Sequence, residues 1–221
     1  MEEFAVIGLG QFGHQVAVSL AQAGHEVLAI DTDMARIEEI KDLVVRAVRA
    51  DASREDVMRA LGVDQVDTAI IGLGEENFEA AVLAVALLRQ LGVPHIIARS
   101  STRERGRILG HVGAEQVIYP EVEVAERLAR RLAAPGLMEE ACLPSGHTLA
   151  EIRLPASLVG RTLADARLRA GYGLNVVAVR RGEDPGASRS LEPSAAMKLE
   201  PGDVLVVVGQ QERVAAFAQL T

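Results

Sequence analysis

The chain has 221 residues, of which 49% are hydrophobic and 24% charged, and its formal net charge is −8 at pH 7. Because neutralising a nucleic-acid backbone needs clustered Lys and Arg, this balance argues against a nucleic-acid partner. The single cysteine, Cys142, excludes an internal disulfide and a cysteine-built zinc site. No apolar run reaches the roughly 18 to 20 residues that cross a bilayer, so we expect a cytosolic protein of two domains.

The first half of the chain alternates short β-branched segments with longer amphipathic ones, which is typical of βαβ units around a parallel sheet. We predict strands at residues 4–8, 27–31, 44–50, 68–72, 95–98 and 116–119. Helices are clearest at residues 11–23, 77–91 and 122–132, where apolar residues recur three and four positions apart. Six such strands make a complete doubly wound sheet, so the fold class is α/β with a Rossmann-type domain.

This periodicity ends at Ala134, Pro135 and Gly136, a composition that closes a helix and begins a connection. We therefore predict a nucleotide-binding domain over residues 1–134 and a second, smaller α/β domain over residues 138–221. The second domain should contain strands at 147–154, 174–181 and 203–208, helices at 162–170 and from 211, a polar loop at 182–190 and, within it, a turn at 182–186. Because about 80 residues give only a small core, we expect this domain to be stabilised by contact with a partner subunit.

The segment from Gly8 to Gly13 reads GLGQFG between a predicted strand and a predicted helix, the context in which G-x-G-x-x-G indicates dinucleotide binding. Gly8 would permit the tight turn, Gly10 would let the backbone approach a phosphate, and Gly13 would let the helix pack closely. The N–H groups and dipole of the helix end would attract the phosphates. Asp31 ends the second strand, where its carboxylate can accept hydrogen bonds from ribose hydroxyls and would repel a 2′-phosphate.

Two questions stay open at this turn. The glycines could serve only the packing of strand against helix, with Asp31 acting only as the cap of the next helix. If a nucleotide does bind, ATP, ADP, AMP and NAD all share the ribose and phosphates that these residues would recognise.

The residues typical of an enzyme are missing. A dehydrogenase would need a proton donor and a substrate anchor beside the nicotinamide. The histidines are scattered along the chain, at His14, His25, His95, His111 and His147. There is no nucleophile elbow, no HExxH and no Walker lysine. We therefore predict a binding protein that is not an enzyme, with an NAD-dependent oxidoreductase as the main rival.

A set of short motifs runs along nearly the whole chain. Those of the first half are GLGQFG, AIDTD with Asp31 and Asp33, ADAS at residues 50–53, IGLG with Gly72 and Gly74, IIARS with Arg99, and GAEQVIYPE, which ends at Glu121. Those of the second half are LVGRTL at residues 158–163 and LEPGDVLVVVG at residues 199–209. Together they resemble the RCK family, in which a TrkA-N domain is followed by a TrkA-C domain.

Members of that family are gating subunits of Trk and Ktr potassium uptake systems and of ligand-gated potassium channels. The resemblance implies a regulatory subunit that senses a nucleotide at the inner face of the cell membrane and gates a potassium-translocating subunit of the KtrB or TrkH kind. It also implies homodimers assembled into an octameric ring, and ATP or ADP as ligand, with NAD(H) as the alternative. An RCK-like sensor of another channel is a further alternative.

The resemblance assigns roles to individual residues. It implies that the phosphates bind at the turn with Gly8, Gly10, Gln11, Phe12 and Gly13, and that Asp31 binds the ribose. The remaining positions that it places around the nucleotide are Asp33, Asp51, Ala52, Gly72, Gly74 and Arg99. Glu121 matches a glutamate that holds a divalent cation or sodium at the dimer interface.

Three of these assignments have open alternatives. The branch that senses ATP often has Arg where this chain has Gln11, which leaves the choice between ATP and ADP open. Glu121 could only complement the dipole of the helix that it begins. Arg99 could be a solvated charge at the end of a strand.

The second domain of the family can bind cyclic di-AMP between two subunits. Arg169, Tyr172, Val176 and Pro193 lie near the matching positions, but Asn175 interrupts the usual apolar stretch. Core packing and dimerisation explain these residues equally well.

Overall fold

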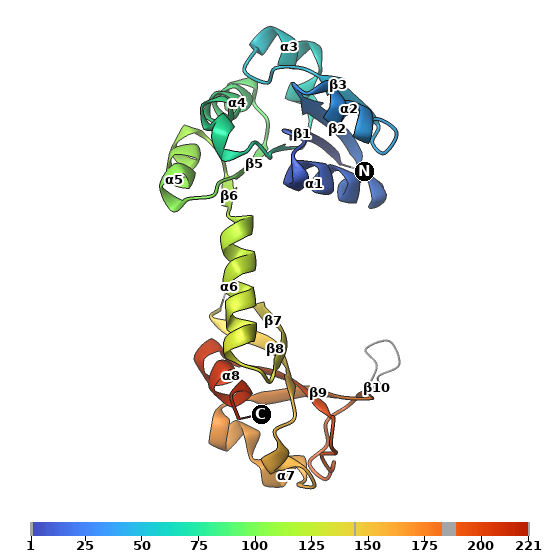
Figure 1. The fold of residues 1–221 in the computed structure, drawn as a ribbon, viewed down its shortest axis with the longest axis vertical. Coiled ribbons are helices and arrows are strands. Elements are labelled where there is room, and N and C mark those ends of the chain that lie inside the picture. Colours follow the sequence, from blue (N-terminus) through green and yellow to red (C-terminus); the bar gives the residue numbers. More distant parts are fainter. Residues whose placement is uncertain (1, 144, 183–188, 221) are drawn as a thin grey trace. The chain divides into compact units, whose positions relative to one another are not determined.

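The computed structural model describes residues 2–143, 145–182 and 189–220 (Figure 1). These residues form two compact units, Met1–Glu123 and Val124–Thr221. None of the helices in the described ranges combines the length and apolar character that crossing a bilayer requires. Most of the turn predicted at residues 182–186 lies outside the described residues.

The first unit contains a sheet of six parallel strands in the order β3-β2-β1-β4-β5-β6. The strands in chain order are β1 (Glu3–Ile7), β2 (Glu26–Asp31), β3 (Arg46–Arg49), β4 (Thr68–Ile71), β5 (His95–Arg99) and β6 (Gln116–Ile118). This is the strand order of the doubly wound Rossmann fold, so the predicted fold class is confirmed. The order reverses between β1 and β4, and in such sheets ligands bind beside the carboxyl ends of the strands at that point.

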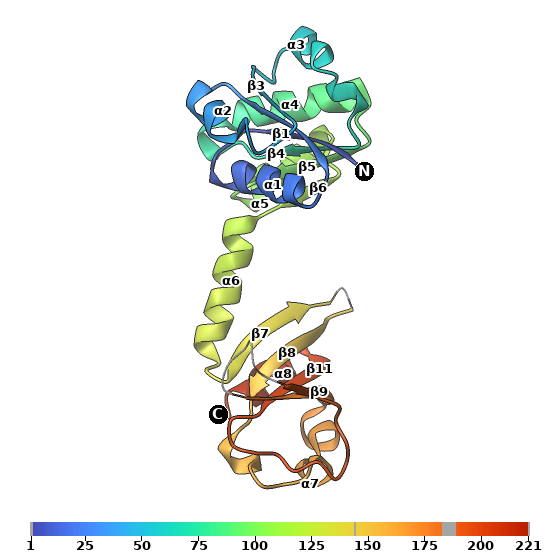
Figure 2. The ribbon, with the colours of Figure 1, turned by 90° about the vertical axis from the view of Figure 1, so that its right-hand side faces the viewer.

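Helices cover both faces of this sheet (Figure 1, Figure 2). They are α1 (Gln11–Gln22), α2 (Met34–Ile40), α3 (Glu55–Ala60), α4 (Phe78–Leu91) and α5 (Arg103–Val112), with the 3₁₀ turns η1 (Val63–Gln65) and η2 (Glu75–Asn77). Successive strand residues point to opposite faces, so Val6 packs with α1 and α2 while its neighbour Ile7 packs with the core that contains α3, α4 and α5. This burial on both sides explains why the central strands β1, β2 and β4 are almost uninterrupted apolar runs, whereas the edge strand β3 has arginine at both ends.

Helix α6 (Pro120–Ala133) continues beyond the division at residue 123, and the next residue, Ala134, packs in the core of the second unit. Because the helix is continuous, the chain offers no loop at residue 123. The predicted domain boundary at residues 134 to 137 coincides with the end of this helix and stays a prediction.

The second unit is built on an antiparallel sheet in the order β10-β9-β11-β8-β7. Its strands are β7 (Leu137–Cys142), β8 (His147–Arg153), β9 (Asn175–Arg181), β10 (Arg189–Leu191) and β11 (Val204–Gln210). The buried side chains of β8 alternate along the strand and pack against α8 (Gln211–Ala218), whose Phe217 is 1% exposed (Figure 2).

Three features of the second unit differ from the sequence prediction. The end of the polar loop predicted at 182–190 belongs to β10, because residues 189–191 pair with residues 179–181 of β9. The helix predicted at 162–170 is the short α7 (Leu163–Ala166), which follows the 3₁₀ turn η3 (Ala156–Leu158) and precedes the π-helical turn η4 (Leu168–Tyr172). Arg167, with φ at 46°, is left-handed and ends the α-helix. The strand β7 was missed because a register shift between Leu137 and Glu139 breaks its alternation.

Candidate functional site

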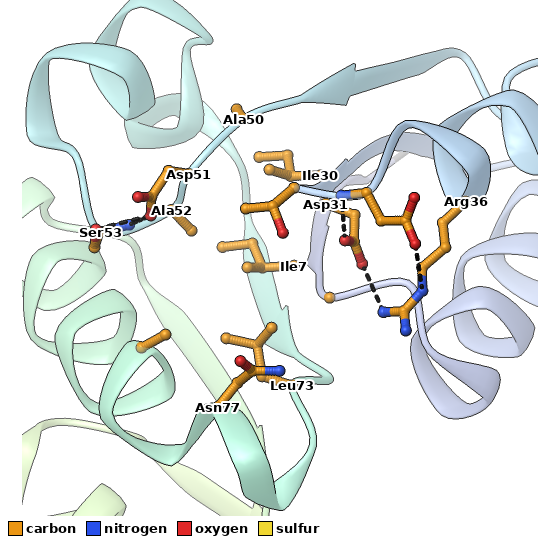
Figure 3. Close-up of a pocket in the computed structure, with 14 residues that line it drawn as sticks. Ile7, Ile30, Asp31, Arg36, Ala50, Asp51, Ala52, Ser53, Leu73 and Asn77 are labelled. Carbon is orange, nitrogen blue, oxygen red and sulfur yellow. Dashed lines mark hydrogen bonds and ion pairs between the residues drawn. The ribbon is translucent and has the colours of Figure 1, made fainter.

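Two adjoining cavities lie at the carboxyl ends of β1, β2 and β4. The first, of about 220 Å³, is walled by the ends of these strands and by the segment after β3, including Asp31, Asp33, Asp51 and Ala52 (Figure 3). The second, of about 630 Å³, is more open and borders the glycine-rich turn and the start of α6. The residues that line both are Gly8, Arg36, Leu73 and Asn77. Small-molecule sites have volumes of roughly 300–1,000 Å³, so the pair is of suitable size.

The three glycines of the turn have different surroundings. Gly8 has a φ of 88°, and a Cβ there would lie 2.8 Å from the side chain of Leu73. A Cβ on Gly13 would lie 1.9 Å from the carbonyl oxygen of Gly8, so Gly13 serves close packing and lines neither cavity. A Cβ on Gly10 would meet no atom within 4 Å. Packing therefore explains Gly8 and Gly13, whereas Gly10 leaves open space beside the second cavity.

Helix α1 begins beside this open space. Its N-cap is Gly10, no side chain caps it, and its first turn carries no acidic residue. The first N–H groups of a helix have no partner within the helix, and the dipole makes this end positive. Gln11 and Phe12 follow and also line the second cavity. This helix end is thus suited to an anion such as a phosphate.

Asp31, which lines the first cavity (Figure 3), is buried, with 7% of its surface exposed, and accepts hydrogen bonds from three groups. Its Oδ2 accepts a hydrogen bond of 2.6 Å from the N–H of Leu9, and its Oδ1 accepts one of 2.9 Å from the N–H of Asp33. The guanidinium of Arg36 lies 3.2 Å from Oδ2. Asp31 therefore ties the glycine-rich turn to the end of β2.

The cap of α2 is Asp33, which accepts a hydrogen bond of 2.9 Å from the N–H of Ala35. The alternative interpretation, in which Asp31 acts only as this cap, is therefore wrong. The reason is geometric, because the helix begins at Met34 and the residue immediately before it takes the capping position.

The far side of the first cavity is formed by the segment after β3. Asp51 accepts hydrogen bonds from the N–H of Ser53, at 2.9 Å, and from its hydroxyl, at 2.7 Å. These bonds hold the pKa of the Asp51 carboxyl below its ordinary value. Ala52 is 8% exposed and continues the apolar wall made by Ile7 and Ile30. An apolar wall with a few acidic acceptors at its rim suits a nucleoside.

A positively and a negatively charged side chain, Arg99 and Glu121, lie together in the wall of the second cavity. Arg99 donates a hydrogen bond to Glu121, and its guanidinium lies 5.9 Å from the ring centroid of Phe12. Burial raises the pKa of the Glu121 carboxyl, but the hydrogen bond from Arg99, a hydrogen bond from the backbone N–H of Glu121 and the positive charge of Arg99 together outweigh it, and the pKa lies below its ordinary value. No group of three or more His, Cys, Asp or Glu in the described ranges is placed to hold a metal ion. An ion at Glu121 would need further ligands from a nucleotide or a second copy of the chain.

Sequence reasoning missed several lining residues. Besides Gly72, Gly74 and Arg99, the second cavity is lined by Glu75, Glu76, Asn77 and Ser101. Asn77 is the N-cap of α4 without a capping hydrogen bond, which leaves its amide available. The sequence does contain a signal for Arg36. A cation in the first turn of a helix is unfavourable beside the helix dipole, so a nearby anion that stabilises it could have been expected.

In the second unit, a shallow cavity of about 360 Å³ is lined by Arg169, Asn175, Val176 and Pro193, together with residues of α7. Tyr172 does not line it. Its ring instead packs edge-on against Phe217, with centroids 4.9 Å apart. Three of the four residues considered for cyclic di-AMP, Arg169, Val176 and Pro193, thus line one cavity, which Asn175 also borders.

Comparison with known proteins gives consistent matches over both units. Residues 4–120 match the TrkA-N domain and residues 149–221 the TrkA-C domain. The Ktr system potassium uptake protein C of Bacillus subtilis is 33% identical over 98% of this chain and 96% of its own length. The Ktr system potassium uptake protein A of Vibrio alginolyticus is 32% identical over 97% of this chain and 95% of its own.

The fold is also similar to that of part of the GsuK channel, with a TM-score of 0.67 at 18% identity, and of the same channel bound to NAD, with a TM-score of 0.63. The match covers 99% of this chain and 39% of the channel chain.

The domain matches and the near full-length relatives together establish the family. The chain belongs to the RCK family, as a TrkA-N domain followed by a TrkA-C domain.

Proposed function

We propose that this protein is a regulatory subunit that senses an adenine nucleotide and gates a membrane potassium transporter. The observation that carries the proposal is the pair of adjoining cavities, which brings the buried Asp31 and the uncapped start of α1 to the switch point of the sheet. The relatives from Bacillus subtilis and Vibrio alginolyticus described above match over nearly their full length and are potassium uptake proteins by name, which supports the same role here.

In this proposal the nucleoside lies in the first cavity and the phosphates in the second. The ribose hydroxyls donate to Asp31, and the adenosine lies between the apolar wall and the segment with Asp51 and Ala52. The phosphates accept hydrogen bonds from the N–H groups at the start of α1. Arg99 supplies a positive charge, and Glu121 would share a divalent cation or sodium with the phosphates.

ATP, ADP and NAD(H) all contain the adenosine and phosphates that this arrangement would bind, and the GsuK channel is a fold neighbour bound to NAD.

Gln11 lines the second cavity, in which this proposal places the phosphates. Replacing it with Arg should raise the affinity for ATP over ADP by about 1.5–3 kcal/mol, because a guanidinium gains a charge-assisted bond where a third phosphate is present. Calorimetry with both nucleotides measures this difference, and an unchanged ratio would place Gln11 away from a terminal phosphate.

A sensor is favoured over an oxidoreductase by the residues around the cavities. All five histidines lie within the described residues, and none of them lines either cavity. The described lining residues also include no Lys, Cys or Tyr. The ionisable side chains that do line the cavities are carboxylates and arginines, and the contacts of Asp31, Arg36 and Arg99 suit them to binding and orienting a nucleotide.

We further propose that homodimers assemble into an octameric ring on the cytoplasmic face of a potassium-translocating subunit of the KtrB or TrkH kind. A nucleotide can shift such an assembly only by its different affinity for two conformations. Cyclic di-AMP at the cavity of the second unit would be a separate input, supported by the grouping of Arg169, Val176 and Pro193.

Reconstitution tests the function directly. The protein and a KtrB-like subunit are placed in liposomes, and potassium flux is measured with ATP, ADP, NADH or no nucleotide. We expect the flux to change with the nucleotide and only when the protein is present. Flux that ignores the protein and every nucleotide, together with turnover of NADH, would favour the oxidoreductase instead.

A further inference from the structure

Arg36 is the one cationic side chain among the described residues that lines both cavities. It lies in the first turn of α2, and its guanidinium contacts two carboxylates (Figure 3). Its Nη1 is 3.2 Å from Oδ2 of Asp31, and its Nε is 3.8 Å from Oδ2 of Asp33. The side chain of Arg36 is 45% exposed, whereas that of Asp31 is 6% exposed. The arginine can therefore change its position more easily than the aspartate.

The hydrogen bonds of Asp31 show what a ribose would meet. A carboxylate offers about four lone-pair positions. The N–H groups of Leu9 and Asp33 use one each, and Arg36 uses another on the same oxygen as Leu9. The two N–H groups belong to the glycine-rich turn and to the start of α2, so they cannot leave without moving the backbone. A ribose that presents both hydroxyls to Asp31 therefore has to replace Arg36.

We infer that Arg36 exchanges partners when a nucleotide binds, leaving Asp31 to the ribose and pairing with the diphosphate in the second cavity. This inference rests on the proposed nucleotide site and deepens it by naming a specificity-determining residue. A nucleoside without phosphates breaks the Arg36–Asp31 ion pair and offers nothing in return. A nucleoside diphosphate supplies oxygens to which a guanidinium can bind in bidentate fashion. Arg36 would thus make the site select phosphorylated nucleotides.

Calorimetry on the full chain tests the exchange, with ADP and adenosine as probes. Arg36→Gln should bind ADP about tenfold or more weakly than the wild type, because a charge-assisted contact is lost. It should bind adenosine as well as or better than the wild type, since no ion pair has to be broken. Arg36→Lys keeps the charge without the planar fork and should lose part of the preference for ADP. Arg59→Gln is the matched control: Arg59 is exposed, pairs with Glu55 on α3 and lines neither cavity.

The outcomes separate this inference from the proposed site. If the wild type prefers ADP and Arg36→Gln loses that preference while Arg59→Gln keeps it, the exchange is supported. If all the proteins bind ADP over adenosine by the same factor, the exchange is wrong although the nucleotide site stands. If the wild type binds neither probe, the site and the exchange are both wrong. Thermal melting shows whether Arg36→Gln folds, and Arg36→Lys carries the test if it does not.

Discussion

Each unit of the protein contains a buried aspartate paired with an arginine, and the two pairs are built differently. Asp203 is fully buried and meets Arg181 through two bonds of 2.8 and 2.9 Å, while the N–H of Glu200 donates to it at 2.8 Å. Asp31 meets Arg36 through a single contact at the edge of a cavity. A closed, bidentate pair is suited to holding a fold, whereas an open, single contact can be exchanged for a ligand.

The largest expected effect tests the structural half of this comparison. Asp203→Asn should lower the free energy of unfolding of the second unit by about 3–5 kcal/mol, because a fully buried amide cannot accept all the bonds that Arg181 and the N–H of Glu200 donate to the carboxylate. Chemical denaturation followed by circular dichroism measures the loss. Glu200→Gln is the control, since this partner of Arg181 is 55% exposed and should cost no more than about 1 kcal/mol. Equal effects of the two variants would contradict the structural role of Asp203.

Asp31→Asn tests the functional half and should have the next largest effect. The amide keeps one acceptor oxygen for the glycine-rich turn but loses the charge that orients the ribose hydroxyls. We expect the binding free energy for ADP to weaken by about 1.5–3 kcal/mol, the range for a hydrogen bond to a charged group. Calorimetry at pH 7 measures it. Unchanged affinity for ADP in a folded Asp31→Asn protein would remove Asp31 from the binding site.

The smallest effect concerns Asp51 and the pH. Hydrogen bonds from Ser53 lower its pKa in the folded protein, so its contribution to stability is present above the ordinary value near 3.8 and is lost as the pH falls through the folded value. The wild type should therefore be slightly more stable than Asp51→Ala at pH 6. The gap should shrink once the pH drops below 3.8. A gap that widens in acid would show that folding raises the pKa of Asp51 instead of lowering it.

The comparison also shows what could be predicted from the sequence. The parallel sheet and the glycine-rich turn follow from local patterns, because buried strands and close helix packing restrict the residues at each position. The place of Arg36 in the first turn of a helix was a signal in the sequence, but its carboxylate partners could not be predicted because they depend on where α2 lies against β2. The strand β7 was missed because its bulge hides the alternation, and the helix at 162–170 was overextended because nothing in its apolar pattern marks the left-handed Arg167.

The central claim is that the first unit binds the nucleotide, whereas the ion pair between Asp203 and Arg181 in the second unit is structural. Amide hydrogen exchange of the full chain, measured with and without ADP, tests this claim most directly. We expect ADP to slow exchange at the glycine-rich turn, at the start of α2 and at residues 51–53, and to leave the strands around Asp203 and Arg181 unchanged. Protection confined to the second unit, or no protection anywhere in the chain, would contradict the assignment of the nucleotide site.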